Sequence, residues 1–196
     1  MPRDLAQRFA EEFVAPKVRE MDAKGTMDPQ IIKGLFDNGF MGIENSPEHG
    51  GSGAPFTSAI LVIEELAQVD PSALYLSNTT IKNCCCEALL DEYIPDVSTS
   101  KVASFCLSEP GGGLDAFALA TRAAKASIGR YIINGSKMWF TVSKEAEIFQ
   151  KSWESKSLEK KGKLGIEASS TCTLDVNKIE VPEENLIGQE NMLLRS

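Results

Sequence analysis

Several features that would assign a sequence to a common class are scarce here. No apolar run approaches the roughly 20 residues that a membrane-spanning helix needs, so we expect no membrane segment. Basic residues are outnumbered, because 20 Lys+Arg face 28 Asp+Glu and leave a net charge of -8. This balance argues against general binding to nucleic acids or to an anionic membrane surface, both of which require a basic face.

Histidine and cysteine are also scarce or unsuitably spaced. The one histidine, His49, lies far from the cysteines, and no CxxC spacing occurs, so we expect no metal site. The five cysteines are an odd number, and three of them adjoin at Cys84–Cys86, which does not resemble a disulfide framework. A reducing compartment with buried, inert thiols fits better. The first residues, Met1 to Asp4, show neither a secretory signal nor a transit peptide, although such segments are removed from mature proteins.

What the chain does have is enough length and apolar content for a core. Its 196 residues, 42% of them apolar, suffice for one medium domain or two small ones. In the first hundred residues, apolar positions recur every three or four residues, which is typical of amphipathic helices. The pattern predicts a helix over 5–21 that Pro16 kinks or breaks, and a second helix that begins at Asp28-Pro29 and ends at Asn38-Gly39.

A third helix is predicted over 57–69. Its predicted buried face consists of Ile60, Ile63, Leu66 and Ala67.

The hydrophobic period changes near Lys101, and short β-prone runs follow. Asn134-Gly135 is a strong signal for a tight turn between two strands. The Lys- and Glu-rich stretch 151–163 is predicted to be a solvated loop or a short exposed helix. The predicted strands are 102–108, 119–126, 130–133 and 137–142, with a last pair at 171–176 and 178–181.

Helices followed by strands, without alternation, indicate an α+β fold or two domains rather than an α/β fold. The change of period near residues 98–101 predicts the boundary. We therefore expect an all-α N-terminal domain over 1–98 and a β-rich domain over 99–196.

A glycine-rich motif runs from Phe105 to Asp115 and reads FCLSEPGGGLD. A predicted strand leads directly into Gly111–Gly113. Glycine lets a ligand approach the backbone closely, and the exposed amides can cradle a phosphate or a polar ring edge. An ordinary turn after a strand explains the same glycines, and the spacing is not that of a dinucleotide fingerprint.

A second motif, Asn134 to Thr141, reads NGSKMWFT. Trp139 and Thr141 are two positions apart, which places them on one face of a strand. A flat ring and a hydrogen-bond donor on one face suit a planar heteroaromatic cofactor. The alternative is that Trp139 is a core residue.

Taken together, and after a helical half, these motifs resemble the acyl-CoA dehydrogenase family, most closely its short/branched-chain members. The resemblance covers roughly residues 3–83, 92–149 and 163–190. The stretches that carry it are Gly34–Ile43, Val62–Ala67, Phe105–Asp115, Asn134–Thr141, Ala168–Cys172 and Val181–Asn185.

The resemblance implies an N-terminal helical domain, a β-barrel-like middle domain and a C-terminal four-helix domain, with FAD between the last two. It implies FAD-dependent oxidation of a short or branched acyl-CoA to the enoyl-CoA, in fatty-acid or branched-chain amino-acid breakdown. In the family a glutamate takes the α-proton, a hydride leaves the β-carbon for flavin N5, and electrons pass to electron-transfer flavoprotein. The resemblance also implies a homo-oligomer in the mitochondrial matrix.

By the same resemblance, five residues would contact the flavin. Phe105, Leu107 and Ser108 would line it, with the Leu107 backbone and the Ser108 hydroxyl at the ring edge. Trp139 would cover one ring face, and Thr141 would donate a hydrogen bond near N5. A donor at that atom stabilises the charge that builds as the hydride arrives.

The sequence also departs from the family pattern. Leu114 stands where the family has a serine that contacts the CoA portion of the substrate, so a hydroxyl contact is lost there. The stretch 150–163 is shorter than in the family, which predicts an incomplete barrel with an open edge. The family's C-terminal domain and its catalytic glutamate have no counterpart in the chain, so no catalytic residue is assigned.

Two alternatives to an active dehydrogenase stay open at this point. The chain could be a catalytically inactive, truncated remnant that serves at most as an interaction or partial ligand-binding module. It could also be a small helical-plus-β interaction module unrelated to the family. A structure without a sheet that carries Trp139 and Thr141 on one face would favour the latter.

Overall fold

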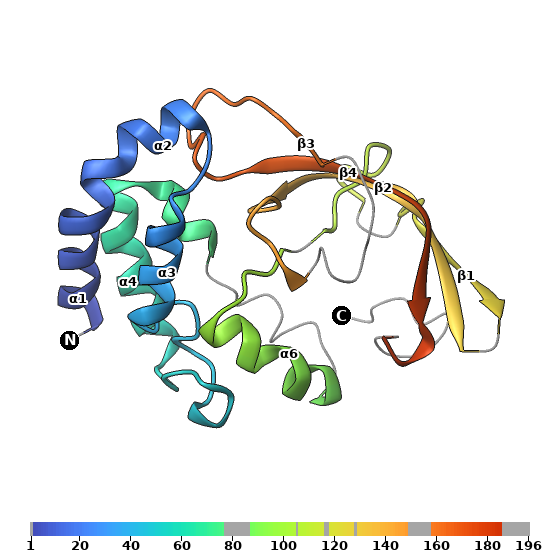
Figure 1. The fold of residues 1–196 in the computed structure, drawn as a ribbon, viewed down its shortest axis with the longest axis horizontal. Coiled ribbons are helices and arrows are strands. Elements are labelled where there is room, and N and C mark those ends of the chain that lie inside the picture. Colours follow the sequence, from blue (N-terminus) through green and yellow to red (C-terminus); the bar gives the residue numbers. More distant parts are fainter. Residues whose placement is uncertain are drawn as a thin grey trace.

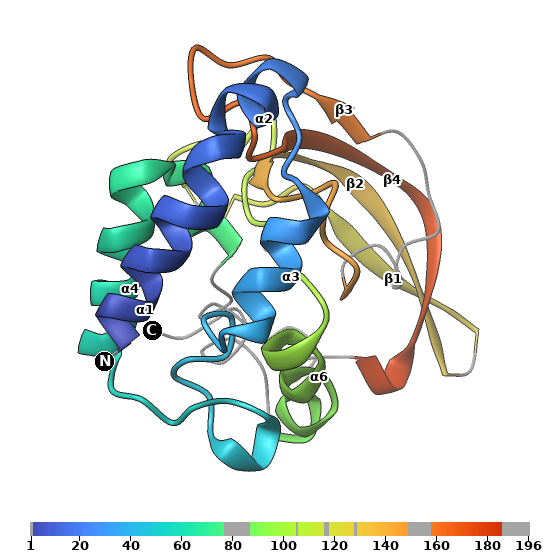
Figure 2. The same ribbon diagram turned by 60° about the vertical axis from the view of Figure 1, so that its left-hand side comes forward.

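The computed structural model describes residues 2–76, 87–104, 106–115, 118–127, 129–148 and 158–185. Helices gather on one side of the molecule and an antiparallel sheet of four strands forms the other (Figure 1). Figure 2 shows the same two layers after a turn, with α1, α3 and α4 grouped together in front of the sheet. The predicted α+β fold, with a helical half followed by an unclosed β half, is confirmed.

The first predicted helix is broken where proline stands. α1 (Pro2–Phe9) passes into a π-helical turn (Ala10–Val14) and a 3₁₀ turn (Ala15–Lys17), and α2 (Val18–Lys24) follows. Proline has no N–H to donate and its ring clashes with the carbonyl four residues before it, so regular α-helical bonding changes around Pro16.

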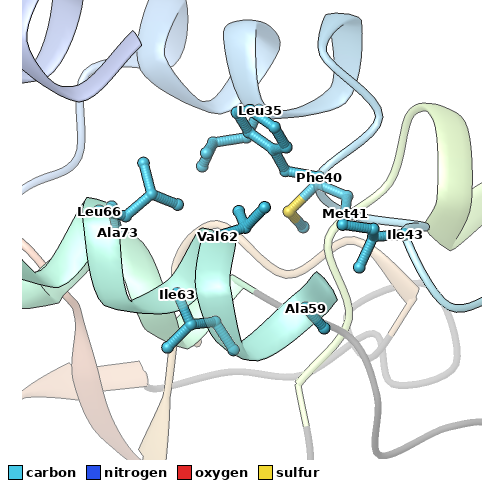
Figure 3. A pocket seen from close by; sticks show the side chains of 9 residues that line it. All are labelled: Leu35, Phe40, Met41, Ile43, Ala59, Val62, Ile63, Leu66 and Ala73. Atoms are coloured by element: carbon cyan, nitrogen blue, oxygen red, sulfur yellow. The ribbon is translucent and has the colours of Figure 1, made fainter. Parts of the chain in front are cut away.

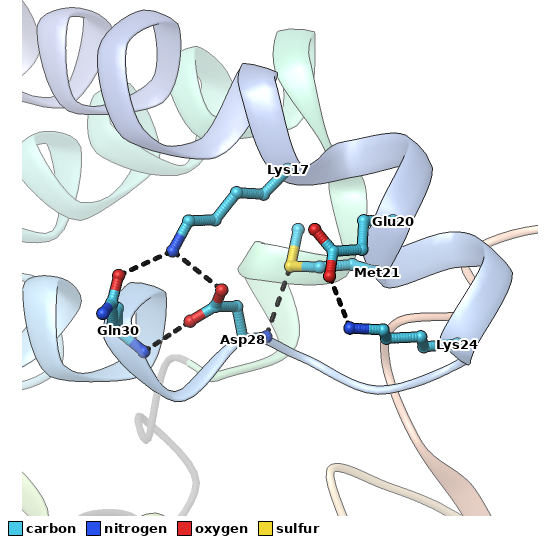
Figure 4. Close-up of polar contacts among 6 residues, drawn as sticks. All are labelled: Lys17, Glu20, Met21, Lys24, Asp28 and Gln30. Carbon is cyan, nitrogen blue, oxygen red and sulfur yellow. Dashed lines mark hydrogen bonds and ion pairs between the residues drawn. The ribbon is translucent and has the colours of Figure 1, made fainter.

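The second helix begins and ends as predicted. α3 (Pro29–Asp37) has Asp28 as its N-cap, and the Asp28 carboxylate accepts a hydrogen bond from the Gln30 N–H at 2.7 Å. The same carboxylate accepts from Lys17 Nζ at 2.7 Å, which ties the start of α3 to the end of the first helical segment (Figure 4). Proline at the first helical position lacks the N–H that would otherwise need a partner.

The third helix forms, but the prediction of its buried face is partly wrong. α4 (Phe56–Val69) buries Ala59, Val62 and Leu66, whereas Ile60 is 43% exposed. Apolar residues occur on most sides of this helix, so their spacing alone does not select the side that meets the core. The buried side faces α3 across a cavity of about 20 Å³, lined also by residues between the two helices (Figure 3).

The helical core reaches into the second half of the chain. Val102, Val142 and Ala168 pack in the same buried cluster as the core residues of α1, α3 and α4. α6 (Glu87–Thr99) lies beside α3, and Asn45 Nδ2 donates to Ser98 Oγ at 2.8 Å. The division into domains at 98/99 stays a prediction.

The sheet has the strand order β1-β2-β4-β3, with every neighbouring pair antiparallel. Its strands are β1 (Arg122–Ser127), β2 (Arg130–Thr141), β3 (Leu158–Lys160) and β4 (Thr171–Pro182). Its core consists of Phe140, Cys172, Leu174, Val176 and Ile179. β3 falls within the stretch predicted to be a loop or a helix, most of which lies outside the described residues.

The turn predicted at Asn134-Gly135 is wrong, because β2 continues through both residues. The Asn134 side chain accepts a hydrogen bond from the Lys178 N–H at 2.8 Å, at an irregularity in the pairing with β4. A Cβ on Gly135 would lie 2.3 Å from Thr121 Oγ1. Glycine is therefore required here because the chain at Thr121 passes close to β2, and not because of a turn.

Two other strand predictions also need correction. The predicted pair at 171–176 and 178–181 is the single strand β4, in which Lys178 has a φ of 54° and accommodates the irregularity. The described part of 102–108 forms no strand. The Val102 carbonyl accepts from the Glu147 N–H at 2.8 Å, whereas the Ser108 carbonyl accepts from the Met138 N–H. The two ends of the stretch 102–108 are thus bonded to different segments, and the stretch does not pair with one strand along its length.

Candidate functional site

The two sequence motifs lie next to each other at one edge of the sheet. β1 pairs with β2 only as far as Asn134. Beyond that point the chain around Ser108 lies along β2, where the Met138 N–H donates to the Ser108 carbonyl at 2.9 Å. Further along, the Ser104 hydroxyl donates to the Thr141 carbonyl. The fold thus brings the glycine-rich motif and the second motif together, although Phe105 itself lies outside the described residues.

Trp139 sits at an irregular position of β2 and is exposed. The pairing of β2 with β4 shifts by one residue between Lys137 and Phe140, and Trp139 has a φ of 57°. The Trp139 side chain is 61% exposed, whereas Phe140 beside it is buried in the sheet core. This exposure excludes the alternative that Trp139 is a core residue. A β-bulge of this kind turns a side chain away from the regular pleat.

Two residues with hydroxyl groups lie near Trp139 along the backbone. Ser108 contacts the strand at Met138, and Thr141 follows two positions after Trp139. Within the described part of the chain, no hydrogen bond to either side-chain hydroxyl occurs. We call Leu107, Ser108, Trp139 and Thr141 the shelf.

The glycines next to the shelf leave space above the backbone. A Cβ added at Gly111 or Gly113 would meet no described atom within 4 Å, and neither residue has a φ in the left-handed region. Neither packing among the described residues nor backbone conformation therefore requires glycine at these two positions. Leu114 follows with its side chain fully exposed. The Gly112 N–H donates to the Glu109 carbonyl at 3.2 Å, so Glu109–Gly112 form a tight turn, and the interpretation of these glycines as an ordinary turn stays open beside the close approach of a ligand.

A buried ion pair lies next to Leu107 of the shelf, and no local sequence pattern indicates it. Lys137 Nζ and Glu109 Oε1 are 2.7 Å apart, and the side chains are 8% and 3% exposed. The Glu109 carboxylate also accepts from the Ala120 N–H at 2.5 Å and the Thr121 N–H at 3.2 Å. Burial would raise the pKa of Glu109, but Lys137 and these N–H donors outweigh it and lower the pKa to about 2.

The thiol nearest the shelf is not reactive. Burial raises the pKa of Cys106 to about 12, although the nearby Lys137 charge opposes this rise. The thiol is therefore protonated at neutral pH and is a poor nucleophile. Cys172 is buried in the sheet core, and Cys84–Cys86 lie outside the described residues.

The described residues suggest neither a metal centre nor a membrane span. They contain no group of three His, Cys, Asp or Glu side chains that could hold a metal ion. None of their helices combines the length and the apolar character that crossing a membrane would take. His49 Nε2 lies 3.0 Å from Asp91 Oδ1 and 42 positions from it in sequence.

Comparison with protein families identifies the chain. Residues 1–101 match the model of the acyl-CoA dehydrogenase N-terminal domain, and residues 104–170 match the model of the middle domain. The chain belongs to the acyl-CoA dehydrogenase family. The resemblance inferred from the motifs is confirmed, and the shelf falls within the middle-domain match.

One relative is the mitochondrial short/branched chain specific acyl-CoA dehydrogenase of Rattus norvegicus, 38% identical over 217 residues. The alignment covers 96% of this chain and 50% of the relative, so the chain spans about half the relative's length. Because the alignment of 217 positions is longer than the 196-residue chain, the relative also contains internal residues that this acyl-CoA dehydrogenase family member lacks.

Solved structures share the fold. A chain of a structure described as the electron transferring flavoprotein of Acidaminococcus fermentans is 32% identical, with a TM-score of 0.85. That match covers 97% of this chain and 57% of the other. An acyl-CoA dehydrogenase from Bacillus anthracis, solved complexed with FAD, is 25% identical, with a TM-score of 0.85 and coverage of 96% and 38%.

Proposed function

We propose that the shelf binds the isoalloxazine ring of FAD, and that the chain thereby contributes to an acyl-CoA dehydrogenase for short or branched acyl-CoA substrates. The observation that carries this proposal is the exposed Trp139 ring on the strand to which Ser108 is bonded, where the Met138 N–H donates to the Ser108 carbonyl. Among the described residues, the hydroxyls of Ser108 and Thr141 make no hydrogen bond. Family membership and the FAD complex of the Bacillus anthracis relative support the choice of ligand.

Each shelf residue has a distinct role in this proposal. The Leu107 backbone and the Ser108 hydroxyl meet the polar edge of the ring. Trp139 covers one ring face, and aromatic stacking of this kind contributes about 0.5–1.5 kcal/mol beyond buried area. The Thr141 hydroxyl donates near N5 and stabilises negative charge there. Phe105, which the family pattern adds to the lining, is proposed from the sequence alone.

The proposed reaction removes two hydrogens from the substrate. The α-carbon loses a proton to a carboxylate base, the β-carbon loses a hydride, and the electron pair of the Cα–H bond forms the new double bond. FAD, when bound, supplies the two-electron acceptor for that hydride. This chain's own residues bind and orient the ring, so that hydride transfer takes place from a fixed geometry.

Glu109 is not the base in this reaction. Its carboxylate is committed to Lys137 and to two backbone N–H groups, and its pKa is lowered to about 2. A group with so low a pKa is a weak proton acceptor at neutral pH. We therefore assign no catalytic base within the described residues, and the buried pair serves another purpose.

The finer assignments follow the relatives. A short or branched acyl chain is proposed from the Rattus norvegicus enzyme, and that relative is also the basis for proposing the mitochondrial matrix. Electron-transfer flavoprotein is proposed as the electron acceptor, consistent with the similarity to a chain described under that name. Leu114 has no hydroxyl to offer the CoA portion, so we expect weaker binding of that portion at this position.

A second function, ligand binding without turnover, is favoured by the openness of the shelf. Binding sites for cofactors usually enclose about 70–90% of their ligand. Here Trp139 is 61% exposed, Leu107 is 39% exposed and Leu114 is fully exposed, so the described residues cover only one side of a ring. In this alternative the chain binds flavin weakly and oxidises no acyl-CoA.

Titration of the purified chain with FAD, followed by flavin fluorescence, tests the proposal. We expect saturable binding that is weak enough for FAD to be lost on gel filtration. Trp139→Leu should weaken binding about 2- to 10-fold, as expected for the loss of one stacking contact. Phe56→Leu is the matched control, because Phe56 is 63% exposed and lies on α4, away from the sheet.

Equal FAD affinity of Trp139→Leu and the unaltered chain would overturn the shelf as the flavin site. Addition of a short-chain acyl-CoA to the FAD-loaded chain separates the two functions. Loss of the visible flavin absorbance supports dehydrogenation by this chain, whereas unchanged absorbance with intact FAD binding supports binding without turnover.

A further inference from the structure

The Glu109–Lys137 pair joins three segments of the middle region. Lys137 belongs to β2, and Glu109 ends the segment around Ser108 that lies along β2. The Glu109 carboxylate also accepts hydrogen bonds from the backbone N–H groups of Ala120 and Thr121, just before β1. Lys137 Nζ also donates to the Leu107 carbonyl at 3.3 Å. One pair of side chains therefore contacts both ends of the glycine loop and the strand that carries Trp139.

A buried ion pair is not explained by stability alone. Removing two charges from water is unfavourable, and replacing such a pair by apolar side chains often leaves a protein equally stable or more stable. Here all the contacts are directional, because the pair holds backbone groups at Leu107, Ala120 and Thr121. Apolar replacements of the same size would fill the space without fixing these groups.

The backbone groups that the pair holds are those of the shelf and of its glycine loop. The Leu107 carbonyl bonded to Lys137 belongs to a shelf residue, and Ser108 beside it is bonded to Met138 of β2. On the other side, Glu109 anchors the loop where it returns at Ala120. The tight turn Glu109–Gly112, in which the Gly112 N–H donates to the Glu109 carbonyl at 3.2 Å, therefore starts at a residue that the pair fixes.

We propose that Glu109 and Lys137 are positioning residues for flavin binding, which hold the ring-edge backbone of Leu107 and Ser108 in register with Trp139. This inference rests on the proposed function. Neither side chain contacts the ring in this account; the pair acts through the backbone of residues 107–109 and through the strand position of Trp139.

The test compares the unaltered chain with Glu109→Gln, Lys137→Met and the double variant Glu109→Leu/Lys137→Met. Each single variant leaves one buried group without its partner and can fail to fold. The double variant fills the buried space with apolar side chains and removes the hydrogen bonds of the pair. It therefore tests the positioning role without leaving an unpaired buried charge. Glu180→Gln is the control, because Glu180 pairs with Arg130 across β2 and β4 at 2.7 Å with both side chains 59% exposed.

Two measurements are made on each folded variant: the dissociation constant for FAD, and the hydrogen-exchange protection of the Met138 N–H without FAD. The Met138 N–H donates to the Ser108 carbonyl, which no variant alters chemically. In the double variant we expect at least tenfold weaker FAD binding and at least tenfold lower protection of Met138, with a thermal midpoint near that of the unaltered chain. Glu180→Gln should change neither quantity.

Equal FAD affinity of the double variant and the unaltered chain would overturn the positioning role while leaving the proposed function intact. Unchanged Met138 protection in the double variant would overturn it too, because the ring-edge backbone would then be held without the pair. Absence of FAD binding by the unaltered chain would instead overturn the proposed function.

Discussion

At the scale of single residues, Glu109 shows how one side chain combines charge and hydrogen bonding. Its carboxylate meets an ammonium group and two backbone N–H donors within a site that is 3% exposed. Each of these partners favours the ionised form, which is why the pKa falls despite burial. A carboxylate held in this way links folding to pH.

This linkage gives a pH prediction. The pKa of Glu109 is lowered from 4.5 to about 2 on folding, so its ionised form stabilises the folded chain above pH 4.5. That contribution is lost as the pH falls from 4.5 to about 2, because the unfolded chain takes up the proton first. We expect the free energy of unfolding, measured by urea denaturation, to fall more steeply over this range in the unaltered chain than in Glu109→Gln.

The exposed carboxylate of Glu180 provides the comparison for that experiment. Glu180→Gln should retain the steep fall, since Glu180 is 59% exposed and its pair with Arg130 is screened by solvent. Parallel stability profiles for the unaltered chain and Glu109→Gln would contradict the ionised, paired state of Glu109.

Residue patterns predicted local events better than distant ones. Pro16 and the Asp28-Pro29 cap act within one helical turn, so the sequence alone placed the helix break and the helix start. The Glu109–Lys137 pair joins positions 28 residues apart, and no local pattern reports such a partner. Gly135 was misread because the contact that requires glycine comes from Thr121.

At the scale of elements, the periodicity of the sequence does not by itself determine how α4 and β2 are placed. α4 has apolar residues on most sides, and packing in the helical core, chiefly against α1, selects the side with Val62 and Leu66. β2 runs through a turn signal and then bulges at Trp139. In both elements, contacts with neighbouring segments determine a feature that local sequence preference does not: the buried side of α4 and the path of β2.

The corrected orientation of α4 predicts unequal effects along one helix. Leu66→Ala removes a side chain that is 3% exposed, so we expect a loss of about 2–5 kcal/mol in the free energy of unfolding. Ile60→Ala, at a position that is 43% exposed, should cost less than about 1 kcal/mol. Chemical denaturation of the two variants provides the comparison. Equal losses would indicate that the originally predicted face of α4 is the buried one.

At the scale of the whole molecule, helices and sheet support one exposed edge. The helical core includes Val102 and Val142, which lie on either side of the shelf in sequence. The sheet core includes Phe140, which follows the exposed Trp139 in the sequence. The chain at Leu107–Glu109 is bonded to β2 through Met138 and Lys137, and we propose that its polar groups face the flavin.

The sequence predicted this architecture in outline and the site in part. The order of helices and strands was accessible from local patterns, whereas the family and the proximity of the two motifs followed from the resemblance. The bulge that exposes Trp139 was not accessible, because it depends on the pairing of β2 with Cys172 and Leu174 of β4. The contacts of Leu107, Ser108, Trp139 and Thr141 with flavin stay a proposal.

The most direct test of the central claim uses lumiflavin, which contains the isoalloxazine ring without the ribityl chain or adenine. Trp139 and Trp153 are the only tryptophans, so Trp153→Phe leaves Trp139 as the single indole emitter. We predict that lumiflavin quenches Trp139 emission saturably, and that FAD competes for the same site whereas AMP does not. Trp139 emission that lumiflavin leaves unquenched, or that AMP restores, would contradict a ring-binding shelf.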